Sequence, residues 1–370
     1  MEDREQELLD AVELPSPNKN FEIGLSTACN FDCPFCYNHA NASYGYYPPK
    51  TIPRKVLESF ILRNAPFQNF VLAVTGEPFL YPDMLEVVRF IHQHVHTINF
   101  STNGSLLTPE IIDLLATCRM NFINVSVDGG GREYATLRRG GSLQKFKENT
   151  AYLAQKLGRK VYFAATVFNQ NRNAVLKLPA LAAEVGVQDI HFFSLNVHPK
   201  MVDRAIGNLS RRELEDFLPR LMDACGQCGV TPHWAPSFMA EDLNDAVLHY
   251  LGIDRHEDES GYRRFCYLPF ERINVDPLGH INFCCYLEFI PGDALREPLA
   301  GWWNCRQVRV LRIMNLVRHF PEVCRVYCHK ISSDDIPLDP DLLYQRCQPF
   351  RDATQAYLGT VKEKQCTHRS

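Results

Sequence analysis

The chain has 370 residues, 45% of them hydrophobic and 22% charged, with a net charge of −4. This is roughly the length of two domains with a globular composition, which excludes a disordered or fibrous chain, and no basic cluster favours nucleic acid. The N-terminus is polar and acidic, and no run approaches the roughly 18 apolar residues of a membrane span. We therefore expect a cytoplasmic protein with neither a membrane nor a nucleic acid as partner.

The first 200 residues repeat one pattern: a short apolar run, a polar or glycine-containing break, and a longer stretch with helical spacing. This order is typical of βα units. We predict strands at residues 21–26, 70–74, 97–100, 122–127, 160–166 and 189–195. Helices are predicted between them, among others at 83–94, 109–118, 143–157 and 176–185. Strands connected in this way pair in parallel with right-handed crossovers. The expected fold class is α/β, with a partial (βα)6 TIM-like barrel.

Each of the first four predicted strands runs into a distinctive polar segment. In chain order these segments contain Cys29, Cys33 and Cys36; Thr75-Gly76-Glu77-Pro78; Ser101-Thr102-Asn103-Gly104; and Ser126-Val127-Asp128-Gly129. In parallel barrels the reactive groups lie at the carboxyl ends of the strands. We therefore expect the functional site where these four segments meet.

Fourteen cysteines are many for a chain without an export signal, because a reducing cytosol does not usually support disulfides. With this number, the Cys29-x3-Cys33-x2-Cys36 spacing is expected by chance only roughly 0.02 times in the chain. Three thiolates from one loop can ligate three irons of a [4Fe–4S] cubane and leave the fourth iron open. A structural zinc would need a fourth ligand, and His39 is the only close one.

The CxxxCxxC loop, followed by TGEP, STNG and SVDG at successive strand ends, resembles the radical S-adenosylmethionine (SAM) superfamily over about residues 20–200. The resemblance implies that the three cysteines of this loop hold a [4Fe–4S] cluster whose open iron chelates the methionine portion of SAM. It also implies reductive cleavage of SAM to methionine and a 5′-deoxyadenosyl radical, which abstracts hydrogen from the substrate. Such an enzyme needs an external one-electron reductant such as flavodoxin or ferredoxin.

The same resemblance implies which residues contact SAM. Glu77 stands where the family binds the methionine ammonium group, and Thr75 replaces the first glycine of the family's GGEP. Arg138 matches the position that holds the SAM carboxylate, with Arg139 as the alternative because the pattern is one residue off in either alignment. The other implied cofactor-binding residues are Phe35 at the adenine, Ser126 at the ribose, and Thr75, Gly76, Ser101 and Asn103. No catalytic acid or base is assigned.

A second group of cysteines lies in the C-terminal third of the chain. Two alternating runs around a Pro/Gly turn at residues 276–279 predict a β-hairpin. The cysteines around it resemble those of the twitch domain, a shortened SPASM domain that holds an auxiliary [4Fe–4S] cluster. The implied ligands are Cys266, Cys284, Cys324 and Cys328. Cys285 competes with Cys284, which fits the Gly-x4-Cys spacing better, and the last pair is spaced CxxxC where the family often has CxxC.

These observations divide the chain into an N-terminal extension (1–20), a radical SAM partial barrel (21–205), a helical connector (206–254), a small α+β twitch/SPASM-like domain (255–335) and a tail (336–370). The predicted function is that of a radical SAM oxidoreductase that completes a two-electron oxidation through the auxiliary cluster. Its substrate is a small molecule or a peptide, in natural-product, sugar/aminocyclitol or peptide modification. The alternative is a non-catalytic iron–sulfur or zinc scaffold, which would not need Glu77, Ser126 and Arg138 at three separate strand ends.

Overall fold

The computed structural model describes residues 9–10, 13–14, 20–36, 49–195, 206–234, 268–283, 290 and 292–316. Its main feature is a curved sheet, in which the strands of these ranges follow the order β7-β6-β5-β4-β3-β2-β1-β8-β9. Every pair of neighbours is parallel except β8 and β9. The strands are β1 (Asn20–Ile23), β2 (Phe67–Leu72), β3 (Val95–Thr102), β4 (Ile123–Ser126), β5 (Val161–Val167), β6 (Asp189–Ser194), β7 (Thr231–Trp234), β8 (Arg272–Val275) and β9 (Ile281–Asn282).

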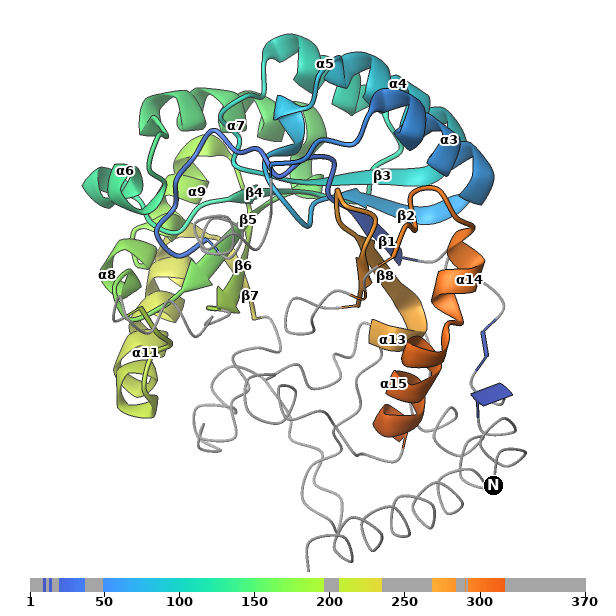
Figure 1. Ribbon diagram of the computed structural model, residues 1–370. Coiled ribbons are helices and arrows are strands. Elements are labelled where there is room, and N and C mark those ends of the chain that lie inside the picture. Colours follow the sequence, from blue (N-terminus) through green and yellow to red (C-terminus); the bar gives the residue numbers. More distant parts are fainter. Residues whose placement is uncertain are drawn as a thin grey trace, which may run out of the picture.

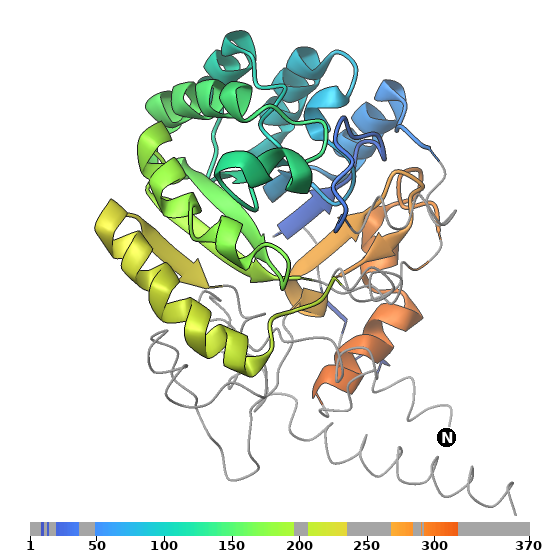
Figure 2. The ribbon, with the colours of Figure 1, turned by 90° about the vertical axis from the view of Figure 1, so that its left-hand side faces the viewer.

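Helices lie around the outside of this curved sheet, as the two perpendicular views in Figures 1 and 2 show. The longer ones that follow the barrel strands are α3 (Arg54–Asn64), α4 (Met84–His94), α5 (Pro109–Thr117), α7 (Leu143–Leu157), α9 (Leu178–Val185) and α11 (Arg211–Cys228). The shorter helices are η1 (Pro78–Leu80), η2 (Gly131–Glu133), α6 (Tyr134–Leu137), η3 (Gly158–Lys160) and α8 (Arg172–Val175). Helices α13 (Leu268–Glu271), α14 (Leu299–Trp303) and α15 (Arg306–Leu316) lie beside β8. Within the described ranges, no helix has the length and apolar character needed to cross a membrane.

Local sequence signals explain where several helices begin. The Thr108 side chain accepts a hydrogen bond from Ile111 N, and Pro109 follows at the first helical position of α5. Ser142 caps α7 in the same way through Lys145 N. Ser210 and Glu213 form a reciprocal capping box at the start of α11. These caps satisfy backbone N–H groups that have no partner inside the helix.

The main core lies between the outer face of the sheet and the helices. Phe21 of β1, Phe60 of α3 and Phe67 of β2 are all fully buried. The ring centroids of Phe21 and Phe67 are 4.7 Å apart, and those of Phe21 and Phe60 are 5.3 Å apart. Because burial of each such ring removes a large apolar area from water, this layer supplies much of the driving force that holds helices to the sheet.

The six predicted strands are present as β1 to β6, and their parallel pairing is confirmed. Strand β1 ends at Ile23 rather than at residue 26: Gly24 N still donates to Val275 O of β8 (3.0 Å), and the chain bends at Leu25. The predicted helix at 176–185 is present as α9, which begins at Leu178, and the short α8 precedes it. Pro179 lies in the first turn of α9, where its missing N–H costs no helical hydrogen bond. Strand β7, with the sequence TPHW, was not predicted.

The predicted hairpin at the C-terminal cysteine group is present as β8 and β9, which pair Asn274 with Asn282. Strand β8 also pairs in parallel with β1 over its whole length. A segment about 250 residues later in the chain therefore extends the barrel sheet at its first strand. The cysteines predicted to hold the auxiliary cluster, Cys266, Cys284, Cys324 and Cys328, lie outside the described residues, as do Cys285 and His39.

Candidate active site

The loop after β1 carries the three cysteines into a small apolar cluster. Cys33 is buried, whereas Cys29 and Cys36 are partly exposed. Phe31 N lies 3.4 Å from Cys29 Sγ, and Cys36 N donates to Cys33 O at 3.1 Å, so the backbone turns tightly between the cysteines. The apolar side chains packed around them are Phe31, Phe35, Leu137, Phe168, Ala174, Leu195 and Ile206. This environment excludes water from much of the loop.

The chemistry of these donors fits an iron–sulfur cubane. In the described part of the chain, no three His, Cys, Asp or Glu side chains surround a point that would hold a single metal ion. A cubane does not require such convergence, because each cysteine ligates a different iron. Burial raises the pKa of the Cys33 thiol to about 12 and also raises that of Cys29, so cluster binding must displace protons from both thiols.

Glu77 lies at the carboxyl end of β2 with its carboxylate 2% exposed. Its Oε1 accepts hydrogen bonds from Thr102 Oγ1 (2.6 Å) and Phe79 N (3.3 Å), and Oε2 accepts one from Asn103 N (2.7 Å). Burial raises the pKa of Glu77 to about 7, although these hydrogen bonds lower it. Three donors therefore fix the orientation of a carboxylate that can bind a cation without further rearrangement.

The turn before Glu77 is shaped by close backbone contacts. Val74 has a φ of +71° and Gly76 a φ of +63°, and the first of these is rare for a β-branched residue. A Cβ at Gly76 would lie 2.4 Å from the carbonyl oxygens of both Ser26 and Ala28. Only glycine fits there, because the TGEP turn packs directly on the chain that enters the cysteine loop.

Thr75 replaces a family glycine, and the structure accommodates its side chain. Thr75 Oγ1 donates to Ser26 O at 2.9 Å, in a buried position. A Cβ at Gly24 would lie 2.2 Å from that same hydroxyl oxygen. Gly24, directly after β1, has no side chain and so leaves room for that of Thr75. Because the Thr75 hydroxyl is bonded to Ser26 O at the start of the cysteine loop, a cofactor at this position would contact the backbone of Thr75.

The STNG segment connects Glu77 to the cysteine loop. Asn103 donates from its backbone N to Glu77 and from Nδ2 to Asn30 Oδ1 (2.9 Å), next to Cys29. Asn103 Oδ1 in turn accepts hydrogen bonds from Ser105 N (2.9 Å) and Ser105 Oγ (2.7 Å). Ser101 lies on the inner face of β3 and is partly exposed. Asn103 therefore orients the cysteine loop, a role that the sequence alone did not assign to it.

Arg138 approaches the cysteine loop from the segment after β4. Its Nε forms an ion pair with Asp128 Oδ2, with 13% of the Arg138 side chain and none of the Asp128 side chain exposed. Its guanidinium carbon lies 5.7 Å from the centroid of the Phe35 ring. Arg139, in contrast, is exposed, and its backbone O accepts a hydrogen bond from Asp32 N (2.9 Å). Of the two candidates, Arg138 is the one whose charge acts on Cys29 and Cys33, whereas Arg139 borders a cavity outside the loop.

Two residues that the sequence analysis did not assign as site residues hold Arg138 in place. Asp128 Oδ1 accepts a hydrogen bond from Thr166 N of β5 at 2.8 Å. The buried Asn171 donates to Asp128 O (2.9 Å) and Thr166 O (2.7 Å), and it accepts from Phe168 N (2.8 Å). The ends of β4 and β5 are thereby clamped together around the partner of Arg138. The only sequence signal for Asp128 is its place in the SVDG segment.

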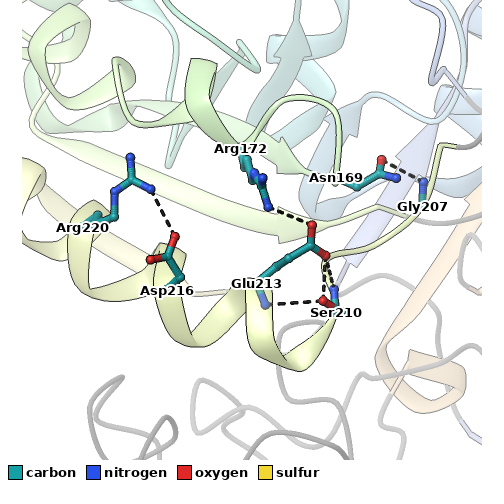
Figure 3. Close-up of polar contacts among 7 residues, drawn as sticks. All are labelled: Asn169, Arg172, Gly207, Ser210, Glu213, Asp216 and Arg220. Carbon is teal, nitrogen blue, oxygen red and sulfur yellow. Dashed lines mark hydrogen bonds and ion pairs between the residues drawn. The ribbon is translucent and has the colours of Figure 1, made fainter.

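A cavity of about 760 Å³ borders the cysteine loop. Its lining residues are Asp32, Cys33, Pro34, Glu133, Thr136, Leu137, Arg139, Phe168, Gln170, Asn173, Ala174 and Ile206. Figure 3 shows how the segment that carries Ile206 is attached: Asn169 Oδ1 accepts from Gly207 N (3.2 Å), and Arg172 pairs with Glu213 of α11 (2.8 Å). Contacts to α11 therefore hold one wall of the cavity.

Known proteins resemble this chain in sequence and in fold. Residues 23–182 match the family model described as the radical SAM superfamily. These residues form a radical SAM domain. The chain is 24% identical over 350 residues to the AdoMet-dependent heme synthase of Methanosarcina barkeri, covering 87% of this chain and 95% of that enzyme. It is 28% identical over 210 residues to a probable GTP 3′,8-cyclase of Saccharolobus islandicus, covering 54% of this chain and 63% of the cyclase.

Solved structures share the fold of this chain. The structure of anSMEcpe with bound AdoMet has a TM-score of 0.60 and 15% identity, covering 95% of this chain and 96% of that one. Streptococcus suis SuiB has a TM-score of 0.62 and 15% identity, covering 89% of this chain and 75% of that one. SuiB has also been solved with S-adenosylmethionine bound. The match of residues 23–182 to this superfamily implies SAM and a [4Fe–4S] cluster as cofactors.

Proposed function

We propose that this protein is a radical SAM oxidoreductase that cleaves SAM at a cluster held by Cys29, Cys33 and Cys36. The observation that carries the proposal is the convergence at one end of the sheet of the cysteine loop, the buried Glu77 carboxylate and the Arg138 guanidinium. The charges of Glu77 and Arg138 both act on the Cys29 thiol, so the three groups lie within electrostatic range of one another. A zwitterion such as the methionine portion of SAM requires this pairing of an anionic and a cationic group beside the metal.

Held by Cys29, Cys33 and Cys36, a reduced [4Fe–4S] cluster would supply the electron that splits SAM into methionine and a 5′-deoxyadenosyl radical, and this radical would take a hydrogen atom from the substrate. In this scheme Glu77 binds the methionine ammonium group and Arg138 the carboxylate, while Ser126 on β4 binds the ribose. Phe35 shields the loop at the adenine position, where its ring lies 4.8 Å from that of Phe168. These residues bind and orient SAM and exclude water, because the radical would otherwise attack solvent.

The second half of the proposal is a net two-electron oxidation. After hydrogen abstraction, an auxiliary [4Fe–4S] cluster would accept one electron from the substrate radical while one proton passes to solvent, and the electron would leave through that cluster. The ligands proposed for it are Cys266, Cys284, Cys324 and Cys328. A flavodoxin or ferredoxin in the cytoplasm delivers the electron that each SAM cleavage needs. The substrate is a small molecule or a peptide, in natural-product, sugar/aminocyclitol or peptide modification.

The test is SAM cleavage by anaerobically reconstituted protein with dithionite, measured as 5′-deoxyadenosine by chromatography. Wild type should release 5′-deoxyadenosine, and the variant with Cys29, Cys33 and Cys36 all replaced by Ala should release none. A matched variant with three other cysteines replaced by Ala, at positions 118, 225 and 228, should retain cleavage. Cleavage by the first variant would refute the cluster assignment. Iron binding without any cleavage by wild type would instead support the scaffold alternative.

A further inference from the structure

On β4 and β5, the inner face of the barrel sheet carries polar side chains. On β4, Ile123 and Val125 are fully buried under the helices, whereas Asn124 and Ser126 on the opposite face are partly exposed. Strand β5 alternates in the same way, with Tyr162, Ala164 and Thr166 on the partly exposed face. Closed parallel barrels fill this face with branched apolar side chains. An inner face that solvent reaches and that carries amides and hydroxyls is instead suited to a polar ligand.

The strand register places this face directly beside the proposed ribose position. Ser126 pairs with Ala164, Ala164 pairs with His191 of β6, and His191 pairs with His233 of β7. Adjacent strands are about 4.8 Å apart, so the backbones at Ser126 and His191 lie about 10 Å apart with only the methyl group of Ala164 between them. A ligand over Ala164 would therefore lie next to the reactive end of SAM.

Three aromatic rings, from β5, β6 and β7, lie next to one another on the side of Ala164 away from Ser126. The ring centroids of Tyr162 and His191 are 4.1 Å apart, and those of His191 and His233 are 4.5 Å apart. His233 Nε2 lies 2.9 Å from Asp189 Oδ1, which also pairs with Arg159 (2.8 Å). These contacts hold the rings in fixed positions. The ligand therefore faces a rigid aromatic strip.

The opposite wall of the barrel carries a compensated ion pair. Arg272 of β8 lies 2.9 Å from Glu22 of β1. Both charges act on Tyr162, which lies on β5, four strands from β1 in the sheet. The pKa of the Tyr162 hydroxyl is raised mainly by burial and lowered by a hydrogen bond with the Asn124 side chain. The Glu22 charge raises this pKa, and the Arg272 charge lowers it. The curvature of the sheet thus brings the two walls within electrostatic range. Because Glu22 and Arg272 compensate each other's charge, this wall does not favour a ligand with a large net charge.

Two amide oxygens on this face need a hydrogen-bond donor. Asn124 Oδ1 and Asn274 Oδ1 are buried, and neither accepts a hydrogen bond from the residues that the structure describes. Asn274 uses its Nδ2 to donate to Asn282 Oδ1 at 2.9 Å, which leaves its oxygen for another partner. Buried acceptors of this kind are normally satisfied by a ligand or an ordered water. Both therefore call for a molecule that presents hydroxyl or N–H groups.

We infer that Asn124, Tyr162 and His191, together with the space over Ala164, form the substrate-binding wall, and that its ligand is a small hydroxyl-rich molecule of the sugar or cyclitol type. The acceptor oxygens bind hydroxyl groups, and the aromatic strip packs against the C–H face of the ring. The inference rests on the proposed function, since it requires SAM to bind beside Ser126. It narrows the substrate class to a small polyol in preference to a peptide.

The experiment uses the full-length, cluster-loaded enzyme with SAM and without reductant. Binding of myo-inositol, methyl α-D-glucopyranoside and the tripeptide glycyl-seryl-glycine is measured by saturation-transfer NMR titration. Ala164→Leu fills the space over this position without removing a polar group, and Asn124→Ala removes one acceptor. The matched control is Ala180→Leu, because Ala180 is exposed on α9. Thermal unfolding checks that each variant is folded. If Ala164→Leu does not fold, the test rests on Asn124→Ala alone.

We expect at least one of the two polyols to bind wild type and Ala180→Leu equally, and its Kd to rise at least tenfold in Ala164→Leu or Asn124→Ala. Equal affinity in the wall variants would overturn the location. Binding of the tripeptide alone, or of no probe, would overturn the ligand class. SAM cleavage by wild type, measured separately, decides the proposed function, so the failure of one proposal is distinguishable from that of the other.

Discussion

The ion pair between Asp128 and Arg138 permits a quantitative prediction. Asp128→Asn retains an acceptor for Thr166 N but replaces a fully buried carboxylate with an amide that cannot neutralise the guanidinium. Breaking a buried pair from one side typically costs about 3–5 kcal/mol, because the remaining charge is left uncompensated. At roughly 2 °C per kcal/mol for a large chain, the Tm of the cluster-free protein should fall by about 6–10 °C. SAM affinity should also fall, with the iron content of reconstituted protein unchanged.

Differential scanning calorimetry of the cluster-free protein and equilibrium dialysis with SAM measure the two effects. The matched control is Asp113→Asn, which breaks an exposed pair with Lys156 (2.7 Å) on the outer helices. Exposed ion pairs contribute little, so this variant should keep both the Tm and the SAM affinity of wild type. The reasoning would be refuted by an unchanged Tm in Asp128→Asn, or by an equal loss in both variants.

Three further predictions concern the same site. Because burial raises the pKa of Glu77 to about 7, SAM affinity measured by dialysis should fall about tenfold per pH unit below pH 7, and Glu77→Gln should bind weakly at every pH. Because the pKa of Glu77 is higher in the folded than in the unfolded protein, Glu77 stabilises the folded SAM-free protein at low pH. This contribution to the urea midpoint should be lost as the pH rises through 7. A pH-independent SAM affinity would contradict the first expectation, and a pH-independent urea midpoint the second. Gly76→Ala should destabilise the protein by about 1–3 kcal/mol in urea unfolding, since its Cβ would meet two carbonyl oxygens, whereas Gly226→Ala, which has open space, should not. Wild type should bind about eight irons per chain and the Cys29/Cys33/Cys36 triple variant about four, as two cubanes require; an iron-free triple variant would remove the auxiliary cluster from the proposal.

Much of the barrel could be predicted because its information is local. Strand and helix periods alternate along the first 200 residues, and handedness rules then leave few ways to arrange them. The cysteine loop is also local, since its three thiols lie within eight consecutive residues. The position of Glu77 after β2 and of Arg138 after β4, at the same end of the sheet, follows from the same parallel order.

Contacts between distant segments could not be read in this way. Nothing near Thr75 indicates that Gly24 leaves room for its side chain, and nothing near Asp128 indicates that Thr166 and Asn171 hold it. The pairing of β8 with β1 likewise joins segments about 250 residues apart. Such pairings depend on loop closure and on steric fit in the folded chain, which sequence spacing does not encode.

The sequence by itself therefore determined the order of the βα units, the cysteine loop and the ends of the strands at which polar groups occur. Only the tertiary structure decided which arginine faces the loop, which carboxylate pairs with it, and that the inner wall around Ala164 is polar. The physical reason is that a strand's period shows that its two faces differ, but not which face the helices cover. That choice is made by packing, when Phe21, Phe60 and Phe67 bury one face of the sheet and leave the other to the barrel interior.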